Sequence, residues 1–427
     1  MTTAGKTIVL IRTSSVARIP VYKHIRSLGI RVIIVHPFQN PAFEGCYDDF
    51  LVHDTNDIDA LENAIVKFQE EKGIDTVDAF LSFDEYGVYP AAVLSERRSK
   101  RSIPLSPSAL QATSVKSAFR TFCYANGINS PASAAIYTPT DDVDAAIAHI
   151  AFPVVIKPSP GAGSLLAKLC NTVTDLKRHA QYMWSVLSGH PDVKHLNALG
   201  TPVHLLIEEY IGGQEVDIDC AIENGVVRFI SISDNFEVQP PYFVESGGVC
   251  PSRLGEKEQQ ALADLLESFL KAHGSSCHGV LHFEAKYDFE RQKAYVIEVN
   301  CRMGSAETNT MILSAYGVQL GECLVRLGLG LPLENITETS HIVKKHCASV
   351  NIYPKAEGAL KHVAVSFGDK ALVDYSISAT PGTLVALPPK SFFLLCWMVA
   401  QGTNSDEAIA NIRRLTGEFV QEIVSAQ

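Results

Sequence analysis

Two neighbouring strand-like segments constrain this chain most: VLHFEAKY at 280–287 and AYVIEVN at 294–300, joined by the charged turn DFERQK. Their alternation of apolar and polar residues predicts a β-hairpin. If the hairpin is symmetric about Arg291, Glu284 lies opposite Glu298, and facing carboxylates repel unless a hard cation lies between them. Magnesium takes oxygen ligands, commonly one or two carboxylates with substrate phosphates. The hairpin therefore predicts a divalent cation site; the alternative is an exposed hairpin with charged outer residues.

Further polar side chains share the face of the two glutamates. Side chains of a strand alternate between its faces, so His282 and Lys286 accompany Glu284, and Asn300 accompanies Glu298. The same register sets His282 opposite Asn300. A histidine buried in the core is the alternative interpretation of His282.

Composition limits the class of protein. A chain of 427 residues fits two or three domains. The net charge of −11 and the lack of a basic tract argue against nucleic acid as a partner. Since no run of about 18 apolar residues and no signal peptide occur, we expect no membrane association. The ten cysteines form no CxxC pair and no zinc-ligand spacing, which is typical of a cytoplasmic protein with reduced thiols; a homodimer is the default oligomer.

Residues 1–110 predict a small doubly wound α/β unit with a parallel sheet. Strands are expected at 7–11, 32–36 and 79–83, and helices near 20–28, 57–71 and 90–99. The first turn, IRTSSVARIP, lacks GxGxxG, which disfavours a dinucleotide. Glu85 follows the carboxyl end of a strand, where open α/β sheets bind ligands, and is a candidate for binding a substrate ammonium group. A solvated surface glutamate is the alternative.

A lysine and a glycine-bearing loop mark the second expected domain, residues 111–205. The strand PVVIKP carries Lys157, and the loop SPGAGS follows at 159–164. A lysine is a point charge suited to phosphate, and glycines let backbone N–H groups approach an anion. The order differs from the GxxxxGK[ST] P-loop, so a plain flexible turn is the alternative. Lys116 and Arg120, one helical turn apart, are by default solvated helix residues.

The third expected domain, residues 206–342, begins around the segment LLIEEYIGGQEVDID. A nucleotide site needs an acceptor for the adenine amino group, backbone polar groups beside it, and a carboxylate for the ribose hydroxyls. A strand that ends at the Gly212-Gly213 turn offers all three, with a surface hairpin of solvated glutamates as the alternative. Strands are expected at 203–211, 214–223, 226–233, 279–287 and 294–300, and helices near 255–273 and 309–329.

The loop NFEVQPPYFVESGGVCPSRLG, at 235–255, is long, aromatic and rich in Gly and Pro. These features predict a substrate-closing lid that contains Glu245 as a second candidate for an ammonium group; a plain surface loop is the alternative. The last expected domain, residues 343–427, is an α+β segment that ends in an amphipathic helix over 406–424.

Taken in chain order, these elements resemble the ATP-grasp superfamily over residues 1–425. The order is Lys116, PVVIKP with its GxGS loop, EEYIGGQE, then H-x-E and EVNCR. Within the superfamily the chain is most similar to L-amino-acid ligases and the ligase domain of carnosine synthase, which join two amino acids through an amide bond. D-alanine–D-alanine ligases and the biotin-carboxylase type are more distant. The resemblance implies an ATP-grasp fold: an N-terminal α/β domain, a two-lobed nucleotide-binding module, and a small C-terminal α+β segment completing the core.

The resemblance also implies how ATP is bound. The implied contacts are phosphate binding by Lys116 and Lys157, a covering loop with Gly161, Gly163 and Ser164, adenine recognition by Glu208 beside the backbone of Glu209 and Ile211, and ribose binding by Glu215.

The implied chemistry lies on the hairpin. Glu284 and Glu298 would bind two magnesium ions, which manganese can replace, with Glu298 bridging them and Asn300 completing the set. Arg302 would stabilise the acyl phosphate and the tetrahedral intermediate, and His282 would lie near the substrate.

Two departures from the family pattern concern specificity and loop motion. Several amino-acid ligases have Arg-x-Gly-Gly after the Asn, whereas this chain has Arg302-Met-Gly304-Ser305. The serine is expected to narrow the carboxylate pocket or to change which backbone N–H is presented to it. The segment GAGSLLAKL also lacks a later glycine, which bears on the flexibility of the loop.

The expected function is therefore that of an ATP-dependent carboxylate–amine ligase, of the acid–amino-acid type, that forms a dipeptide-like amide through an acyl phosphate. Alternatives are a carboxylating ATP-grasp enzyme that uses bicarbonate, and a D-alanine–D-alanine-type ligase. A nucleotide-binding sensor without turnover is the non-enzymatic alternative, but it does not need a full phosphoryl-transfer set of carboxylates, lysines and arginine.

Overall fold

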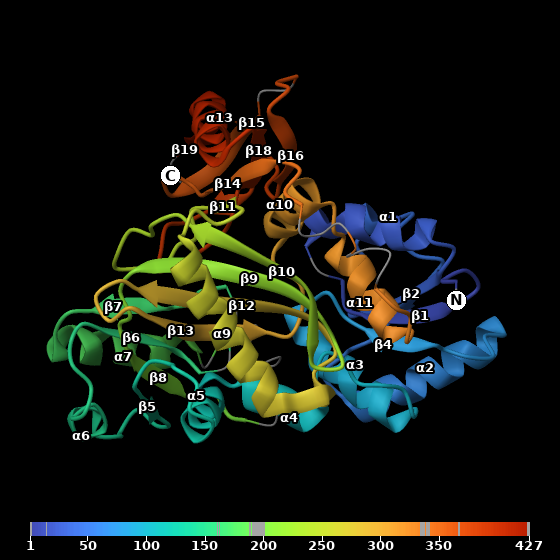
Figure 1. Ribbon diagram of the computed structural model, residues 1–427, viewed down its shortest axis with the longest axis horizontal. Helices are drawn as coiled ribbons and strands as arrows, with labels where there is room; N and C mark the ends of the chain where they lie inside the picture. Colours follow the sequence, from blue (N-terminus) through green and yellow to red (C-terminus); the bar gives the residue numbers. More distant parts are fainter. Residues whose placement is uncertain are drawn as a thin grey trace.

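The computed structural model describes residues 2–13, 15–159, 161, 163–187, 189, 201–333, 338, 342–365 and 368–424. One large sheet crosses the middle of the molecule, and the other elements are arranged around it (Figure 1). In this view the N-terminal lobe lies to the right of the sheet, a lobe with a small sheet lies at the lower left, and the C-terminal elements lie above.

The N-terminal lobe contains a parallel sheet, as its buried apolar strands predict. In spatial order its strands are β3 (Asp49–Val52), β2 (Arg31–His36), β1 (Thr7–Ile11) and β4 (Ala79–Leu81). Its helices are α1 (Ile19–Ser27), α2 (Ile58–Lys72) and α3 (Glu85–Arg97), with 3-10 turns η1 (Val16–Arg18) and η2 (Pro41–Phe43). The doubly wound unit is confirmed. The expected start of the third helix near residue 90 is wrong, because the helix begins five residues earlier, at Glu85, where Asp84 caps it by accepting the N–H of Tyr86.

The lobe with the small sheet holds the glycine-bearing loop. Its antiparallel strands, in spatial order, are β5 (Ser133–Ile136), β8 (Leu205–Glu209), β6 (Val154–Pro158) and β7 (Lys168–Cys170). Helices α6 (Val143–Ala146) and α7 (Val173–Leu187) belong to this lobe, and α4 (Pro107–Ser114) and α5 (Lys116–Ala125) precede it. Of the expected loop 159–164, residues 160 and 162 lie outside the described part of the chain.

The large sheet is antiparallel and carries the predicted hairpin at one edge. Its strands, in spatial order, are β13 (Lys293–Asn300), β12 (Gly279–Asp288), β9 (Gln214–Glu223), β10 (Val226–Asn235), β11 (Gly248–Cys250), β14 (His346–Ile352), β18 (Cys396–Gly402) and β16 (Leu372–Ile377). Helix α9 (Glu256–His273), which is followed by η3 (Gly274–Ser276), packs its apolar side on alternate residues of β12, including Leu281 and Phe283. The other face of β12 is therefore left for polar side chains.

The helix expected over 309–329 is two helices, α10 (Ala306–Tyr316) and α11 (Leu320–Gly328). Gly317 adopts a left-handed conformation, with φ of 76°, and ends α10 there. One apolar core joins α10, α11 and the large sheet to the N-terminal lobe. The domain boundaries at 110, 205 and 342 stay a prediction.

The C-terminal elements complete the fold. Strands β17 (Leu384–Val385), β15 (Gly358–Ala364) and β19 (Val420–Val424) form a small antiparallel sheet, in that order. The helix expected over 406–424 is too long: α13 (Ser405–Glu418) ends at Glu418, and the remaining residues pair with β15 as β19. The mixed α/β architecture expected from the ATP-grasp resemblance is confirmed.

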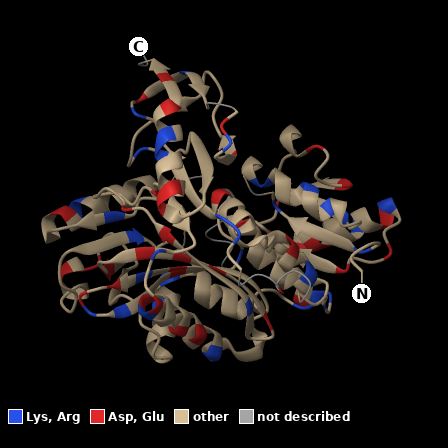
Figure 2. Cartoon of the chain, turned by 45° about the horizontal axis from the view of Figure 1, so that its top comes forward, with Lys and Arg blue, Asp and Glu red and all other residues tan. Residues whose placement is uncertain are grey.

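The distribution of charged residues and the state of the cysteines agree with the composition. In the view of Figure 2, lysines and arginines are interspersed with aspartates and glutamates over the described chain. All ten cysteines are buried and unpaired. Among the described residues, no helix combines the length and the apolar character that crossing a bilayer requires.

Candidate active site

A cavity of about 280 Å³ lies between the small sheet and the large sheet. Residues of β6 and β8 form one wall, residues of β9, β12 and β13 form another, and the loop after β10 and the start of α10 add to it. The predicted site residues that line this cavity are Lys116, Lys157, Gly161, Gly163, Ser164, Glu208, Glu209, Ile211, Glu215, Glu245, His282, Glu284, Glu298, Asn300, Arg302 and Ser305. Two others, Glu85 and Gly304, do not line it: Glu85 contacts Arg302, which does, and the N–H of Gly304 donates to Asp219, which lies behind the lining.

The predicted hairpin register is confirmed at the two glutamates. Glu284 pairs with Glu298, and His282 pairs with Asn300. A bulge after Glu284 shifts the pairs toward the turn, so Ala285 lies opposite Val296, and the symmetry about Arg291 holds only for the end of the hairpin that carries the site.

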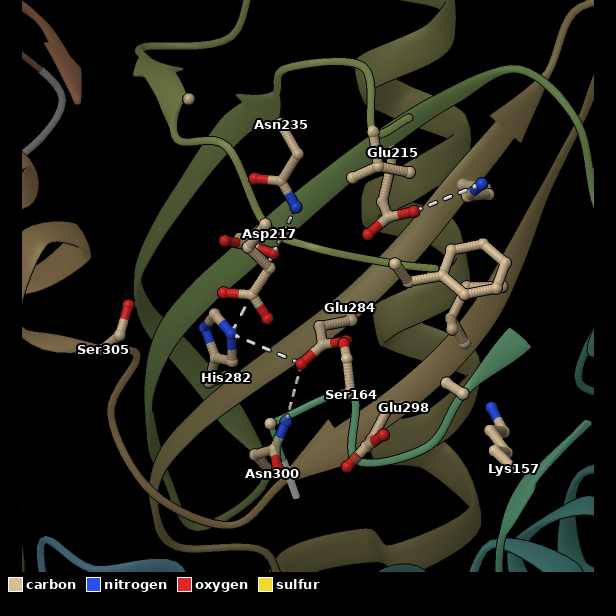
Figure 3. Close-up of a pocket in the computed structure, with 18 of the residues that line it drawn as sticks. Lys157, Ser164, Glu215, Asp217, Asn235, His282, Glu284, Glu298, Asn300 and Ser305 are labelled. Atoms are coloured by element: carbon tan, nitrogen blue, oxygen red, sulfur yellow. Dashed lines mark hydrogen bonds and ion pairs between the residues drawn. The ribbon is translucent and has the colours of Figure 1, made fainter. Parts of the chain in front are cut away.

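Three carboxylates form a row across the sheet. Asp217 of β9 pairs with Glu284 of β12 on the side away from Glu298. Figure 3 shows the side chains of these three residues directed into the cavity, with Asn300 Nδ2 donating to Glu284 Oε1 at 3.0 Å. Burial, followed by the charge of Glu298, raises the pKa of Glu284 to about 8. A cation between the two glutamates relieves this repulsion.

These donors fit magnesium. Among the described residues no three His, Cys, Asp or Glu side chains form a ready-made metal cage. Magnesium is commonly held by one or two carboxylates plus substrate phosphates, with retained waters. Glu284 and Glu298, with the amide oxygen of Asn300 after a rotation of that side chain, supply such a donor set beside the lysines described next.

Lys116 lies next to this row. Its Nζ is 3.1 Å from Glu298 Oε2 and donates to the carbonyl of Gly161 at 2.6 Å. The default expectation of a solvated Lys116 is wrong, because the first residue of α5 faces the cavity and is only 7% exposed. The glycine-bearing loop, α5 and β13 therefore meet at one cation.

Lys157 takes part in a second buried ion pair. Its Nζ lies 2.6 Å from Glu208 Oε2, and Arg120 Nε lies 2.6 Å from Glu208 Oε1. Burial opposes ionisation of Glu208, but the two cations hold the pKa of this carboxyl below its ordinary value. Arg120 is buried as well, which corrects its default assignment to solvent. The adenine role of Glu208 stays a prediction, with both carboxylate oxygens already accepting hydrogen bonds in this structure.

The EEYIGGQE segment adopts the predicted strand and turn. Gly213 has φ of 88°, and a Cβ there would lie 2.0 Å from the carbonyl oxygen of Tyr287, so only glycine fits. Beyond the turn, Glu215 pairs with Lys286 of β12 at 3.2 Å. The backbone N–H of Glu209 donates to Ala132 O at 2.8 Å, and its carboxylate pairs with Arg291 at 2.5 Å.

Arg302 is oriented from the N-terminal lobe. Its Nε lies 3.0 Å from Glu85 Oε2, at the first residue of α3. Burial raises the pKa of Glu85, and the guanidinium of Arg302 opposes that shift. Glu85, expected to hold a substrate ammonium group, therefore holds Arg302 in this structure, and its contact with substrate stays a prediction.

The chain after Arg302 is fixed by two buried charges that the sequence did not single out. Arg18 donates to the carbonyls of Phe83 and Gly304, the latter at 2.6 Å. Asp219 accepts the N–H of Gly304 at 2.9 Å and lies 3.1 Å from His282 Nδ1. A Cβ on Gly304 would lie 2.8 Å from that aspartate oxygen, which leaves no room for a side chain.

The sequence also missed Asp217 and Glu307, which line the same cavity. For Asp217 and Asp219 a signal was present, because both alternate with Glu215 along one predicted strand and share its face. Glu307 and Arg18 give no comparable signal, since each reaches the site through the packing of distant helices.

The fold and the residues of the cavity together indicate a class of protein. Residues 150–310 match the family model described as an ATP-grasp domain. The chain contains an ATP-grasp domain and has the ATP-grasp fold.

Particular relatives narrow the comparison. The chain is 27% identical to carnosine synthase 1 from Gallus gallus over 340 residues, which cover 77% of this chain and 36% of the relative. The chain spans about a third of the length of such curated relatives. The crystal structure of an L-amino acid ligase from Bacillus licheniformis matches with a TM-score of 0.85 and 16% identity over 100% of both chains.

A third protein with a similar structure is a carboxylase domain. The biotin carboxylase domain of the 2-oxoglutarate carboxylase from Hydrogenobacter thermophilus, solved with MgADP and bicarbonate, matches with a TM-score of 0.71. Its sequence identity is 16%, and the match covers 98% of this chain and 91% of that one. Proteins that share this fold thus include both ligases and carboxylases.

Proposed function

We propose that this chain is an ATP-dependent ligase that joins a carboxylate to an amine through an amide bond, with an acyl phosphate as the intermediate. The observation that carries the proposal is the convergence of Glu284, Glu298, Lys116, Lys157 and Arg302 on one cavity. Facing carboxylates suit magnesium, and the lysines suit phosphates. The similarity to carnosine synthase 1 and to an L-amino acid ligase favours amino acids as substrates.

In the first step a substrate carboxylate oxygen attacks the γ-phosphorus of ATP, the bond from that phosphorus to the bridging oxygen breaks, and ADP leaves. When bound at Glu284, Glu298 and Asn300, magnesium supplies charge neutralisation for the phosphate oxygens. Lys116, beside Glu298, and Lys157, on the opposite wall, orient the phosphates, so the protein contributes mainly position and electrostatics.

In the second step a neutral amine nitrogen attacks the acyl carbon. The bond from that carbon to the phosphate oxygen breaks, phosphate leaves, and the nitrogen loses a proton to solvent. Arg302, held by Glu85, donates to the oxygen that gains negative charge. Water must be kept away from the acyl phosphate. The loop 236–247 is suited to keeping water out. The backbone N–H of Leu169 in β7 donates to the carbonyl of Pro241 in this loop, and Glu245 of the same loop lines the cavity.

The proposal is tested by a phosphate-release screen over pairs of amino acids, with mass spectrometry of the products. ADP formation that requires both amino acids, together with an amide product, is the expected result. Phosphate release that needs only bicarbonate would instead favour the carboxylating alternative. The structural similarity to the biotin carboxylase domain is the observation that supports this alternative. Pairs of D-alanine in the screen test the D-alanine–D-alanine type, and ATP binding without ADP formation in every mixture would indicate a sensor.

A further inference from the structure

The cavity holds more carboxylates than ATP and magnesium use. Each Lys or Arg that lines it already has a carboxylate within 3.2 Å; the pairs are Lys116 with Glu298, Lys157 with Glu208, Lys286 with Glu215 and Arg302 with Glu85. Three more cavity carboxylates are Asp217, Glu245 and Glu307. Among the described residues no Lys or Arg forms an ion pair with any of these three; Asp217 lies 3.9 Å from His282 Nε2 and accepts a hydrogen bond from Asn235 Nδ2 at 3.0 Å.

The three carboxylates lie together, away from the nucleotide lysines. Figure 3 shows Asp217 and Ser305 on one side of Glu284, and Lys157 on the other. Glu307 stands in the first turn of α10, just after Ser305. Burial, then the charges of Asp217 and Glu307, raise the pKa of Glu245 to about 7. Three elements that are distant in sequence thus bring negative charge to one end of the cavity.

A second observation indicates that a bound ligand places a hydrogen-bond donor at this end of the cavity. Asn351 of β14 lines the cavity and is 9% exposed. Its Nδ2 donates to Glu307 Oε1 at 3.3 Å, but its Oδ1 is buried and accepts no hydrogen bond. Since a buried acceptor without a partner is costly, a donor group of the ligand is expected there.

We propose that Asp217, Glu245, Glu307 and Asn351 form a subsite for a side-chain ammonium group, so that one substrate is a basic amino acid of the lysine or ornithine class. An ammonium group has three N–H donors and no acceptor, which matches a cluster of acceptors with surplus negative charge. One carboxylate is enough for the α-ammonium group of any amino acid, so the further carboxylates select a second cation. This inference rests on the proposed ligase function.

Binding measurements test the subsite separately from ligation. Isothermal titration with magnesium and a non-hydrolysable ATP analogue compares L-lysine with L-norleucine, whose side chain carries no charge. We expect lysine to bind at least about tenfold more tightly, and Glu307→Gln to reduce this preference about tenfold. Asn351→Ala is expected to reduce it as well. Glu237→Gln, at an exposed carboxylate of the same loop as Glu245, should leave the preference unchanged.

The outcomes separate this inference from the proposed function. Equal affinities for lysine and norleucine would overturn the subsite. So would a magnesium ion that binds to the three carboxylates and prevents lysine from binding. A lysine preference that depends on Glu307, without ADP formation in any amino-acid mixture, keeps the subsite and overturns the ligase. Unchanged thermal denaturation of Glu307→Gln and Asn351→Ala shows that a lost preference is not lost folding; if either variant unfolds, the other decides.

Discussion

Lys116 and Glu298 form an ion pair of 3.1 Å that joins the first residue of α5 to the edge strand of the large sheet. A cation suited to phosphate thus lies within bonding distance of a carboxylate suited to magnesium. Bound MgATP would replace this direct contact by contacts through its phosphates and metal. The pair therefore marks where the nucleotide and the metal meet.

Glu298→Gln should abolish ADP formation, because the amide removes one negative charge from the proposed magnesium site. The fold should persist, since the substitution keeps the shape of the side chain. Steady-state ADP release and circular dichroism check the two statements. Glu290→Gln, at an exposed glutamate in the turn of the same hairpin, is the matched control. Near-normal turnover of the Glu298 variant would sink the metal assignment.

Arg302→Ala should spare ATP binding and lower amide formation by about 10²–10³-fold, the cost of removing one donor to a developing oxyanion. The comparison of ATP affinity by titration with single-turnover amide yield checks this split. Glu85→Gln should show a weaker form of the same defect, because it keeps Arg302 but removes the charge that orients it. Unchanged ligation by both variants would remove Arg302 from the mechanism.

Arg18→Met should lower kcat more than it changes the KM for ATP, although Arg18 does not line the cavity. The reason is that its guanidinium binds the carbonyls of Phe83 and Gly304 and so fixes the chain that follows Arg302. Losing hydrogen bonds of this charged group should also lower the free energy of unfolding by about 1.5–3 kcal/mol. Urea denaturation measures the stability term, and a variant with normal kcat and lowered stability would limit Arg18 to a purely structural role.

His273 makes stability depend on pH outside the active site. Burial between Phe122 and Phe269 lowers its pKa to about 4, below the ordinary value of 6.5. The unfolded chain therefore binds a proton between these values while the folded chain does not, so stability is lost as pH falls from about 6.5 toward 4. Thermal unfolding at pH 7 and pH 5 should show a smaller loss for His273→Phe than for the natural chain. The exposed His362, changed to Gln, serves as control; an equal loss in all three would contradict the assignment.

The sequence predicted those parts of the site that one strand or one hairpin determines. Period-two alternation placed Glu284 opposite Glu298 because the whole relationship lies within a single hairpin. The bulge after Glu284 was not predicted, because the pattern of apolar residues does not indicate it. The burial of Lys116, and the support of Gly304 by Arg18, depend on contacts between lobes, which alternation within one segment does not encode.

Two helix ends were predicted wrongly for a similar reason. The end of α10 was missed although Gly317 stands there, because the apolar periodicity continues into α11. The last expected helix was extended over β19 for the same reason, since Val420–Val424 also suits an amphipathic helix when its pairing with β15 is unknown.

Oxygen transfer tests the central claim most directly. Once an amino-acid pair is found in the screen, the carboxylate of the activated substrate is labelled with ¹⁸O, and the released inorganic phosphate is examined by mass spectrometry. The account predicts one labelled oxygen in each phosphate, because the carboxylate oxygen that attacks the γ-phosphorus leaves with it. Unlabelled phosphate, or label in AMP, would contradict activation through an acyl phosphate.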